Sequence, residues 1–223
     1  MSSGSCWAVV AVKARARCKS RLAPLLDDAG RVRLAREMLG HVLGVVRATQ
    51  AVDALLVVSP ERDTLPAEVA LVEDAGDDLN RAFETARHYA IGAGAGPLLL
   101  LPADLPSLRC DDLDALIAGG TASGIAIAPD HAGTGTNALY LERPAGFPLA
   151  FGPGSRAAHE RAARERGLLP SIIVRPGLQA DIDTVRDCEA HWSEWHQARA
   201  AIPSTAATSQ SSWPRTPARW SAC

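Results

Sequence analysis

The feature that most constrains the fold is a run of four leucines at residues 98–101, followed by a turn segment with prolines at positions 102 and 106. A strand built only of leucine presents apolar side chains to both faces of its sheet, so both faces must be covered. Four other short apolar runs alternate with amphipathic segments, and they lie at residues 7–12, 54–58, 124–128 and 171–174. This alternation predicts an α/β domain with a mostly parallel, twisted sheet flanked by helices.

The segments between the apolar runs carry helical patterns. The clearest helix is expected to begin at Asp27 or Asp28, either of which can cap it, and its apolar face continues to Val46. Further helices are expected at residues 79–90, 111–118, 155–166 and 185–199. From Pro203 the chain is rich in Ser, Thr, Ala and Pro and has no helical periodicity. We therefore expect one domain over residues 1–200 and a disordered tail over residues 201–223.

Charge and cysteine usage narrow the class of protein. A net charge of -2 argues against a general nucleic-acid-binding protein, whose domains carry a strongly basic face. No apolar run reaches the roughly 18 residues of a membrane-spanning helix, and the N-terminus lacks the charged segment of a secretory signal. The five cysteines include no CxxC pair, which indicates neither a disulfide framework nor a zinc site. We expect a cytoplasmic protein with reduced thiols and no membrane partner.

The residues that follow each apolar run are the first candidates for a site, because ligands of α/β sheets bind beyond the carboxyl ends of the strands. After the first run come five cations on alternate residues, namely Lys13, Arg15, Arg17, Lys19 and Arg21. Cations between a strand and a helix can bind a polyphosphate, since Arg supplies forked hydrogen bonds and Lys a compact charge. The alternative is a solvated charged face.

Two acidic motifs supply candidate metal ligands. Asp104 lies in the proline-framed turn after the leucine run. It can bind magnesium, which needs only one or two carboxylates besides substrate phosphates, or it can be a turn or N-cap residue. Asp181 and Asp183 lie just before the last expected helix and point the same way if the segment is extended. They can complete a metal site, or Asp183 or Thr184 can cap that helix.

Two glycine-containing stretches are candidates for anion binding. GTGTN, at residues 133–137, offers glycines for close backbone approach together with two hydroxyls and an amide. FGPGS, at residues 151–155, ends on Ser155 at an expected helix start, where free amides attract phosphate or carboxylate. Ser155 as a plain N-cap is the alternative, and the two roles are compatible. No GxxxxGK[ST] or GxGxxG motif follows a strand, which excludes the usual ATPase and dinucleotide-binding classes of protein.

Six segments follow one another along the chain, and the last ends at Cys188. They are VKARARCKSRLAPLL, GDDLNRAFETA, LPADLPSL, APDHAGTGTNALYL, FGPGSRAAHERAARERGL and LQADIDTVRDC. With this combination the chain resembles the 2-phospho-L-lactate guanylyltransferase family of coenzyme F-420 biosynthesis. Six motifs in register over about four fifths of the chain are specific, where one alone would be weak. The resemblance implies a single-domain, GT-A-like (Rossmann-like) nucleotidyltransferase that binds GTP and magnesium (Mg²⁺).

The implied reaction is attack by a three-carbon phospho-acid on the α-phosphorus of GTP, with release of pyrophosphate. The family's acids are 2-phospho-L-lactate, phosphoenolpyruvate and 3-phospho-D-glycerate, and the sequence does not choose among them. The product would pass to the enzyme that transfers it to the deazaflavin. Two alternatives are a GT-A enzyme with a molybdopterin or sugar-phosphate acceptor and a GTP-binding protein without turnover. A homodimer also stays open, because Trp192 and Trp195 can pack on the core or on a partner.

The resemblance also assigns roles by matching position. The triphosphate would be held by Lys13, Lys19, Ser20 and Arg21, with Arg15 and Arg17 at the rim. Magnesium would be bound by Asp104 and Asp183, and the nucleoside would lie near Asp78 and Asn80. The phospho-acid would be received by Thr136, Asn137, Gly152 and Ser155. The catalytic residues would be Lys13, Lys19, Arg21 and Asp104, which act by positioning and charge neutralisation without a general base. Cys18 and Asp77 depart from the family pattern, and either Asp77 or Asp78 matches the family's aspartate.

Overall fold

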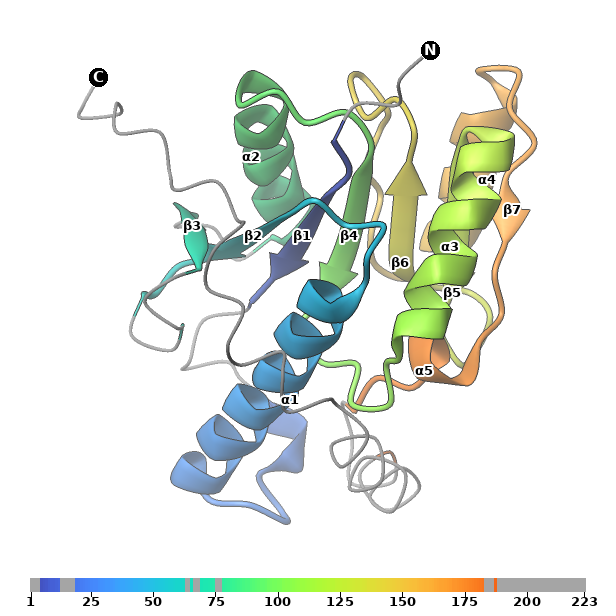
Figure 1. Ribbon diagram of the computed structural model, residues 1–223. Coiled ribbons are helices and arrows are strands. Elements are labelled where there is room, and N and C mark those ends of the chain that lie inside the picture. Colours follow the sequence, from blue (N-terminus) through green and yellow to red (C-terminus); the bar gives the residue numbers. More distant parts are fainter. Residues whose placement is uncertain are drawn as a thin grey trace.

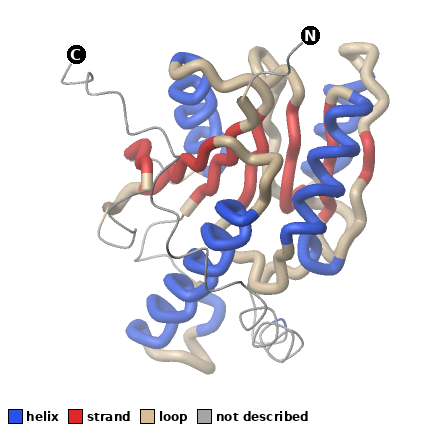
Figure 2. Tube along the Cα trace, in the orientation of Figure 1, coloured by secondary structure: helices blue, strands red, loops and turns tan. Residues whose placement is uncertain are grey.

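The computed structural model describes residues 5–12, 19–62, 65, 69–74, 78–182 and 187. In these residues a central sheet lies between two layers of helices, as Figures 1 and 2 show. The sheet has seven strands in the order β3-β2-β1-β4-β6-β5-β7. The strands are β1 (Trp7–Ala11), β2 (Ala54–Ser59), β3 (Ala70–Glu73), β4 (Leu98–Pro102), β5 (Ile125–Pro129), β6 (Thr136–Leu141) and β7 (Ser171–Ile172). The helices are the short 3-10 helix η2 (Ser20–Leu22), α1 (Asp28–Ala48), α2 (Leu79–Gly92), α3 (Cys110–Ser123), α4 (Ser155–Arg164) and α5 (Pro176–Gln179).

The strands of the sheet run parallel apart from β6, which is antiparallel to both of its neighbours, β4 and β5. The predicted α/β domain with a mostly parallel sheet is confirmed. Because β6 runs the other way, its first residues lie at the edge of the sheet where the parallel strands end. Thr136 and Asn137 are the first two residues of β6. The stretch expected to be an anion-binding loop therefore reaches this edge as the beginning of a strand.

The leucine run forms β4, which lies in the middle of the sheet. All four leucine side chains are fully buried. Leu99 and Leu101 pack in the core with residues of α1 and α3, whereas Leu98 and Leu100 pack in the core with residues of α2 and α4. Burial of each leucine contributes about 2 kcal/mol to stability. The expectation of a strand covered on both faces is confirmed.

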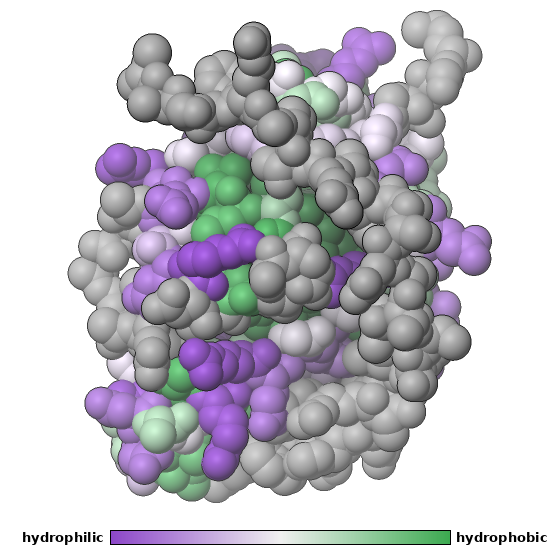
Figure 3. Space-filling view, turned by 60° about the vertical axis from the view of Figure 1, so that its left-hand side comes forward, coloured by the Kyte–Doolittle hydropathy of each residue, from purple (hydrophilic) through white to green (hydrophobic). Residues whose placement is uncertain are grey.

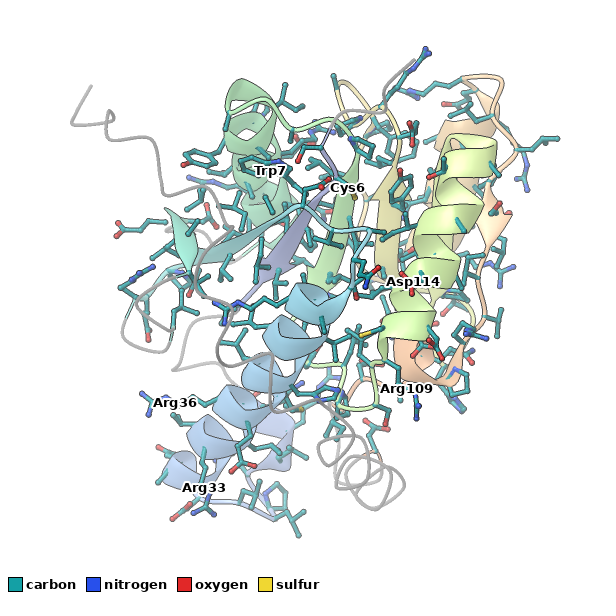
Figure 4. The ribbon with its side chains drawn as sticks, viewed as in Figure 1. Cys6, Trp7, Arg33, Arg36, Arg109 and Asp114 are labelled. Atoms are coloured by element: carbon teal, nitrogen blue, oxygen red, sulfur yellow. The ribbon has the colours of Figure 1, made fainter. Side chains whose placement is uncertain are left out.

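Helix α1 begins where the sequence indicates. The Asp27 side chain accepts a hydrogen bond from the Gly30 amide at 2.7 Å, which caps the helix. Leu34 and Met38 are buried on one side of the helix. Arg33 and Arg36 are exposed and project outward from α1 in Figure 4. In Figure 3, hydrophilic side chains gather on the lower part of the molecule, at the height where Figure 1 draws α1.

Helices α2, α3 and α4 match the predictions in place, although some boundaries differ, whereas η2, α5 and the strands β3 and β6 were not predicted. Helix α3 continues to Ser123, and it ends at Gly124, whose φ of 84° favours glycine. Strand β3, which was not predicted from the sequence, contains the short apolar run at residues 70–72; it has four residues at the edge of the sheet and is only partly buried. No helix in the described part of the chain combines the length and hydropathy needed to cross a bilayer. The helix expected at 185–199 and the tail expected at 201–223 lie outside the described residues, so the boundary at residue 200 stays a prediction.

Candidate functional site

A cavity of about 450 Å³ opens at the carboxyl ends of β1 and β4 and at the start of β6. Its volume lies within the range of ligand-binding pockets. Charged and polar side chains on its wall come from segments far apart in the sequence, and they are Lys19, Ser20, Arg21, Asp104, Asp130, Thr136, Asn137 and Asp181. Apolar side chains complete the wall, among them Met38, Leu79, Phe83 and Phe151. A polar ligand with an apolar part would fit such a lining.

The cavity collects most of the described residues that the sequence analysis singled out. Those on its wall are Lys19, Ser20, Arg21, Asp104, Thr136, Asn137, Gly152 and Asp181. Ser155 is buried at the first position of α4, next to this wall. Lys13, Arg15, Arg17, Cys18, Asp77 and Asp183 lie outside the described residues. The roles assigned to these residues stay predictions.

Lys19 and Asp104 form a close ion pair on the cavity wall. The Lys19 Nζ atom lies 2.5 Å from Asp104 Oδ2, and the two side chains are 6% and 20% exposed. The Lys19 backbone has φ 51° and ψ 38°, which places this residue alone among the described non-glycine residues in the left-handed region. Such a conformation costs about 1–3 kcal/mol and is found most often at functional sites. The turn before η2 thus holds a cation over the end of β4 at some cost in backbone strain.

Three carboxylates line the cavity, and each accepts a hydrogen bond from another residue. Asp104 pairs with Lys19, and Asp130 accepts a hydrogen bond from the Thr134 amide at 2.9 Å. Asp181 accepts a longer hydrogen bond, at 3.4 Å, from the Asn137 side chain. Carboxylate oxygens are the ligands that Mg²⁺ prefers. Within the described residues no three acidic, His or Cys side chains are grouped closely enough to form a metal site by themselves.

Asn137 connects β6 to the segment that carries Asp181. Its amide nitrogen donates to the carbonyl oxygens of Leu178 and Gln179, at 2.9 and 3.3 Å. Asn137 is buried, with 8% of its surface exposed. These hydrogen bonds hold α5 and the residues after it against the sheet. Asn137 therefore positions a carboxylate of the cavity in addition to lining its wall.

The wall around Gly152 is built by a loop that enters α4. Gly152 has a φ of 126°, which other residues rarely adopt. Ser155 lies two positions after Pro153 and is only 1% exposed. Its hydroxyl oxygen has no hydrogen-bond partner among the described residues. A buried hydroxyl without a partner is uncommon and calls for an explanation such as a ligand. Its place at the beginning of a ten-residue helix suits an anion.

Asn80 holds this loop in place. Its side chain accepts a hydrogen bond from the Phe151 amide at 2.6 Å and donates one to the Phe151 carbonyl at 2.9 Å. Asp78 caps α2 by accepting from the Asn80 amide at 2.8 Å. The described cavity wall includes neither Asp78 nor Asn80. Their expected position near the nucleoside stays a prediction, and the structure gives Asn80 a clear role in fixing the Phe151–Gly152 backbone.

Several residues of the site were not singled out from the sequence. Asp130 lines the cavity, and the rings of Phe83 and Phe151 pack with centroids 4.7 Å apart. His159 is fully buried behind Thr136, with its Nδ1 atom 3.0 Å from the Thr136 hydroxyl. The sequence places His159 four residues after Ser155, hence on the same side of α4, which is the signal that could have found it. Phe83 and Phe151 lie in separate segments, and sequence order does not reveal that they meet.

Comparison with protein families and curated sequences gives consistent matches. The family described as "Guanylyl transferase CofC like" matches residues 6–191. A phosphoenolpyruvate guanylyltransferase of Sphaerobacter thermophilus is 41% identical over 187 residues, which cover 82% of this chain and 90% of that protein. One from Rubrobacter xylanophilus is 40% identical over 188 residues, which cover 82% of this chain and 91% of that protein.

Solved structures share the fold. A nucleotidyl transferase from Methanothermobacter thermautotroptrophicus superposes with a TM-score of 0.62 and 17% identity, covering 86% of this chain and 98% of the other. The 4-diphosphocytidyl-2C-methyl-D-erythritol synthase of Anaerococcus prevotii superposes with a TM-score of 0.59 and 8% identity, covering 89% and 96%. At these identities the likeness concerns the fold alone. It agrees with the nucleotidyltransferase fold that the sequence resemblance implies.

Proposed function

Because this chain belongs to the CofC-like guanylyl transferase family, we propose that it transfers the guanylyl group of GTP to phosphoenolpyruvate, within the cavity at the carboxyl ends of β1 and β4. The chain is a guanylyltransferase by family. The proposal adds the acceptor, the metal and the residues that do the work. Its place would be the guanylylation step of coenzyme F-420 biosynthesis.

One observation carries the residue assignments. The residues proposed for the triphosphate (Lys19, Ser20 and Arg21) and those proposed for the acid (Thr136, Asn137 and Gly152) line the same cavity. Both substrates therefore have binding groups in one space, as direct transfer between them requires. A phosphate oxygen of the acid attacks the α-phosphorus of GTP, and a new P–O bond forms. The bond from the α-phosphorus to the bridging oxygen breaks, and pyrophosphate leaves.

The side chains contribute by charge and position. Lys19 and Arg21 stabilise the negative charge that moves onto the departing pyrophosphate. Lys13, which completes this cationic set in the family pattern, is assigned the same role. The attacking phosphate is already an anion, so no residue has to remove a proton from it. The Thr136 and Ser155 hydroxyls, with the backbone at Gly152, hold the acid.

Magnesium is proposed as the metal. The cavity fits it, because Asp104 and Asp181 supply hard oxygen ligands and Mg²⁺ commonly takes its other ligands from water and substrate phosphates. We assign Asp104 and Asp183 as its ligands; Asp181, two residues before Asp183, brings the same segment to the cavity wall. Bound there, the ion would neutralise charge on the phosphates of GTP.

Two grounds favour phosphoenolpyruvate, of which the first sets it apart from both other acids and the second sets it apart from 3-phospho-D-glycerate alone. The curated relatives at 41% and 40% identity are named phosphoenolpyruvate guanylyltransferases. In addition, the apolar part of the cavity wall includes Phe83 and Phe151. A methylene group packs well against aromatic rings, whereas an unpaired hydroxyl such as that of 3-phospho-D-glycerate costs about 1–3 kcal/mol to bury.

The test is a side-by-side assay of the purified protein with GTP, Mg²⁺ and each of the three acids. Pyrophosphate release and the mass of the product are measured. We expect the highest kcat/KM with phosphoenolpyruvate. A higher value with another acid would correct the acceptor and leave guanylyl transfer intact. GTP binding without pyrophosphate release from any acid would instead favour a GTP-binding protein without turnover.

A further inference from the structure

His159 is fully buried on α4 and hydrogen-bonded through both ring nitrogens. Its Nε2 atom accepts from the Ala150 amide at 3.0 Å, and its Nδ1 atom lies 3.0 Å from the Thr136 hydroxyl oxygen. The Phe151 ring packs edge-on against the imidazole with centroids 5.1 Å apart, and Phe147 lies on another side at 6.1 Å. These hydrogen bonds and ring contacts hold the imidazole in one orientation.

The two hydrogen bonds determine the tautomer. A backbone amide can only donate, so His159 Nε2 must carry no proton. A neutral imidazole with a bare Nε2 carries its proton on Nδ1 and donates it to the Thr136 hydroxyl oxygen. Burial lowers the pKa of His159 to about 4, so the ring is neutral at physiological pH. The Thr136 hydroxyl is thereby the acceptor in this hydrogen bond.

An accepting hydroxyl keeps its own proton for another partner. Thr136 lines the cavity, and no acceptor for its hydroxyl proton is present among the described residues. From this geometry we infer that His159 is a positioning residue, which fixes the Thr136 hydroxyl as a hydrogen-bond donor to the phospho-acid. The inference rests on the proposed function, because it needs the acid to bind at Thr136. It gives a role to a buried histidine that the transfer chemistry itself does not use.

A double-mutant cycle tests the connection between the two side chains. Thr136→Val keeps the shape and removes the hydroxyl, and His159→Phe keeps a ring between Phe147 and Phe151. We expect Thr136→Val to raise the KM for the acid roughly 10- to 100-fold, the effect of losing a hydrogen bond to an anion. We expect His159→Phe to raise it roughly fivefold or more, within the range of measured couplings. In both variants the KM for GTP should stay within about twofold of wild type.

The double variant separates positioning from a merely structural role. In Thr136→Val no hydroxyl is left for His159 to orient, so the KM of the double variant for the acid should be no higher than that of Thr136→Val alone. Thr136→Ser, which keeps a hydroxyl, should restore the KM of the wild type to within a few-fold. If the two substitutions instead raise the KM for the acid by independent factors that multiply in the double variant, while the wild type turns over normally, this inference is overturned and the proposed function stands. Failure of the wild type to use any phospho-acid would overturn the proposed function and this inference with it.

A second measurement needs neither activity nor a substituted chain. Nitrogen-15 chemical shifts of the assigned His159 ring in the wild-type protein report which nitrogen carries the proton. We expect the Nδ1–H tautomer at pH 7, with Nε2 unprotonated. An Nε2–H tautomer or a doubly protonated ring would overturn the inference even if His159→Phe failed to fold.

Discussion

At the scale of single residues, Lys19 and Asp104 form the most constrained charged pair of the site. Lys19 is held in a left-handed backbone conformation, and its ammonium is almost entirely buried against the Asp104 carboxylate. Under the proposed function, the Asp104 carboxylate would exchange its lysine partner for the metal ion, and Lys19 would bind a phosphate. Removing the negative charge of Asp104 should therefore lower the catalytic activity with GTP more than it lowers the stability of the fold.

We expect Asp104→Asn to lower kcat/KM roughly 100-fold or more, the effect of removing one preorganised electrostatic contact from an active site. Steady-state kinetics at saturating Mg²⁺ measure it. Asp114→Asn is the matched control, because Asp114 is exposed on α3, away from the cavity wall (Figure 4). Its kinetics should be those of the wild type. Full activity of Asp104→Asn would contradict the proposed metal assignment.

His159 makes stability depend on pH in a defined direction. Burial lowers its pKa from 6.5 to about 4, so between these values the unfolded chain binds a proton that the folded protein does not. The stabilisation is fully present above pH 6.5 and is lost as the pH falls toward 4. By pH 4 the loss amounts to about 3 kcal/mol. Urea unfolding at several pH values should show this loss in wild type and lack it in His159→Phe.

The control is His88→Gln, which removes an exposed histidine of α2. It should keep the pH dependence of the wild type. If the wild type and His159→Phe lose stability in parallel between pH 6.5 and 4, the buried neutral histidine is not the cause.

At the scale of elements, the sequence predicted β1, β2, β4, β5, β7 and helices α1 to α4, but not the edge strand β3 or β6, the strand that completes the site. The leucine run predicts β4 and its two covered faces, because apolar residues at every position fit no other strand environment. By contrast, β6 begins with Thr136 and Asn137, and polar residues with nearby glycines indicate a loop. Thr136 pairs with Pro129 of β5 at an irregularity in the register, and sequence order does not reveal this pairing.

The candidate site was predictable to a similar extent. Lys19, Arg21 and Asp104 follow apolar runs, so the rule that ligands bind at strand ends finds them. Phe83 and Phe151 meet through contacts between separate segments, which no local pattern encodes, and for His159 the only local signal is its spacing of four residues from Ser155. Asn80 is a further example. The family motif predicts that it lies near the nucleoside, but nothing in the sequence indicates that its side chain hydrogen-bonds to the Phe151 backbone.

The packing of α3 on β6 provides a prediction at this scale. A Cβ atom added at Gly120 would lie 2.0 Å from the Tyr140 ring, so alanine there must push the helix and strand apart. We expect Gly120→Ala to lower the free energy of unfolding by about 1–3 kcal/mol, as measured by urea denaturation. Gly40→Ala on α1 is the control, because among the described residues no atom beyond its chain neighbours and the backbone of its own helix lies within 4 Å of the added Cβ. It should stabilise the protein by up to about 1 kcal/mol, as alanine does in helices.

At the scale of the whole molecule, the cavity lies where several parts of the chain meet. Its wall combines residues that follow β1 and β4, the beginning of β6, one end of α2 and the segment after α5. These segments separate when the protein unfolds, so the unfolded chain offers no equivalent site. A ligand of this cavity must therefore stabilise the entire fold, by an amount set by its concentration relative to its Kd.

We expect GTP with Mg²⁺, at about 100 times its Kd, to add roughly 2.7 kcal/mol to the free energy of unfolding. For a chain of this size that corresponds to an increase in Tm of about 5–10 °C. Thermal unfolding monitored by circular dichroism measures the shift. Chelation of Mg²⁺ should reduce it, and Asp104→Asn should reduce it to the same level, because both remove the interaction between the carboxylate and the metal-bound triphosphate. An Asp104→Asn variant whose Tm still responds to Mg²⁺ as the wild type does would place the ion elsewhere in the molecule.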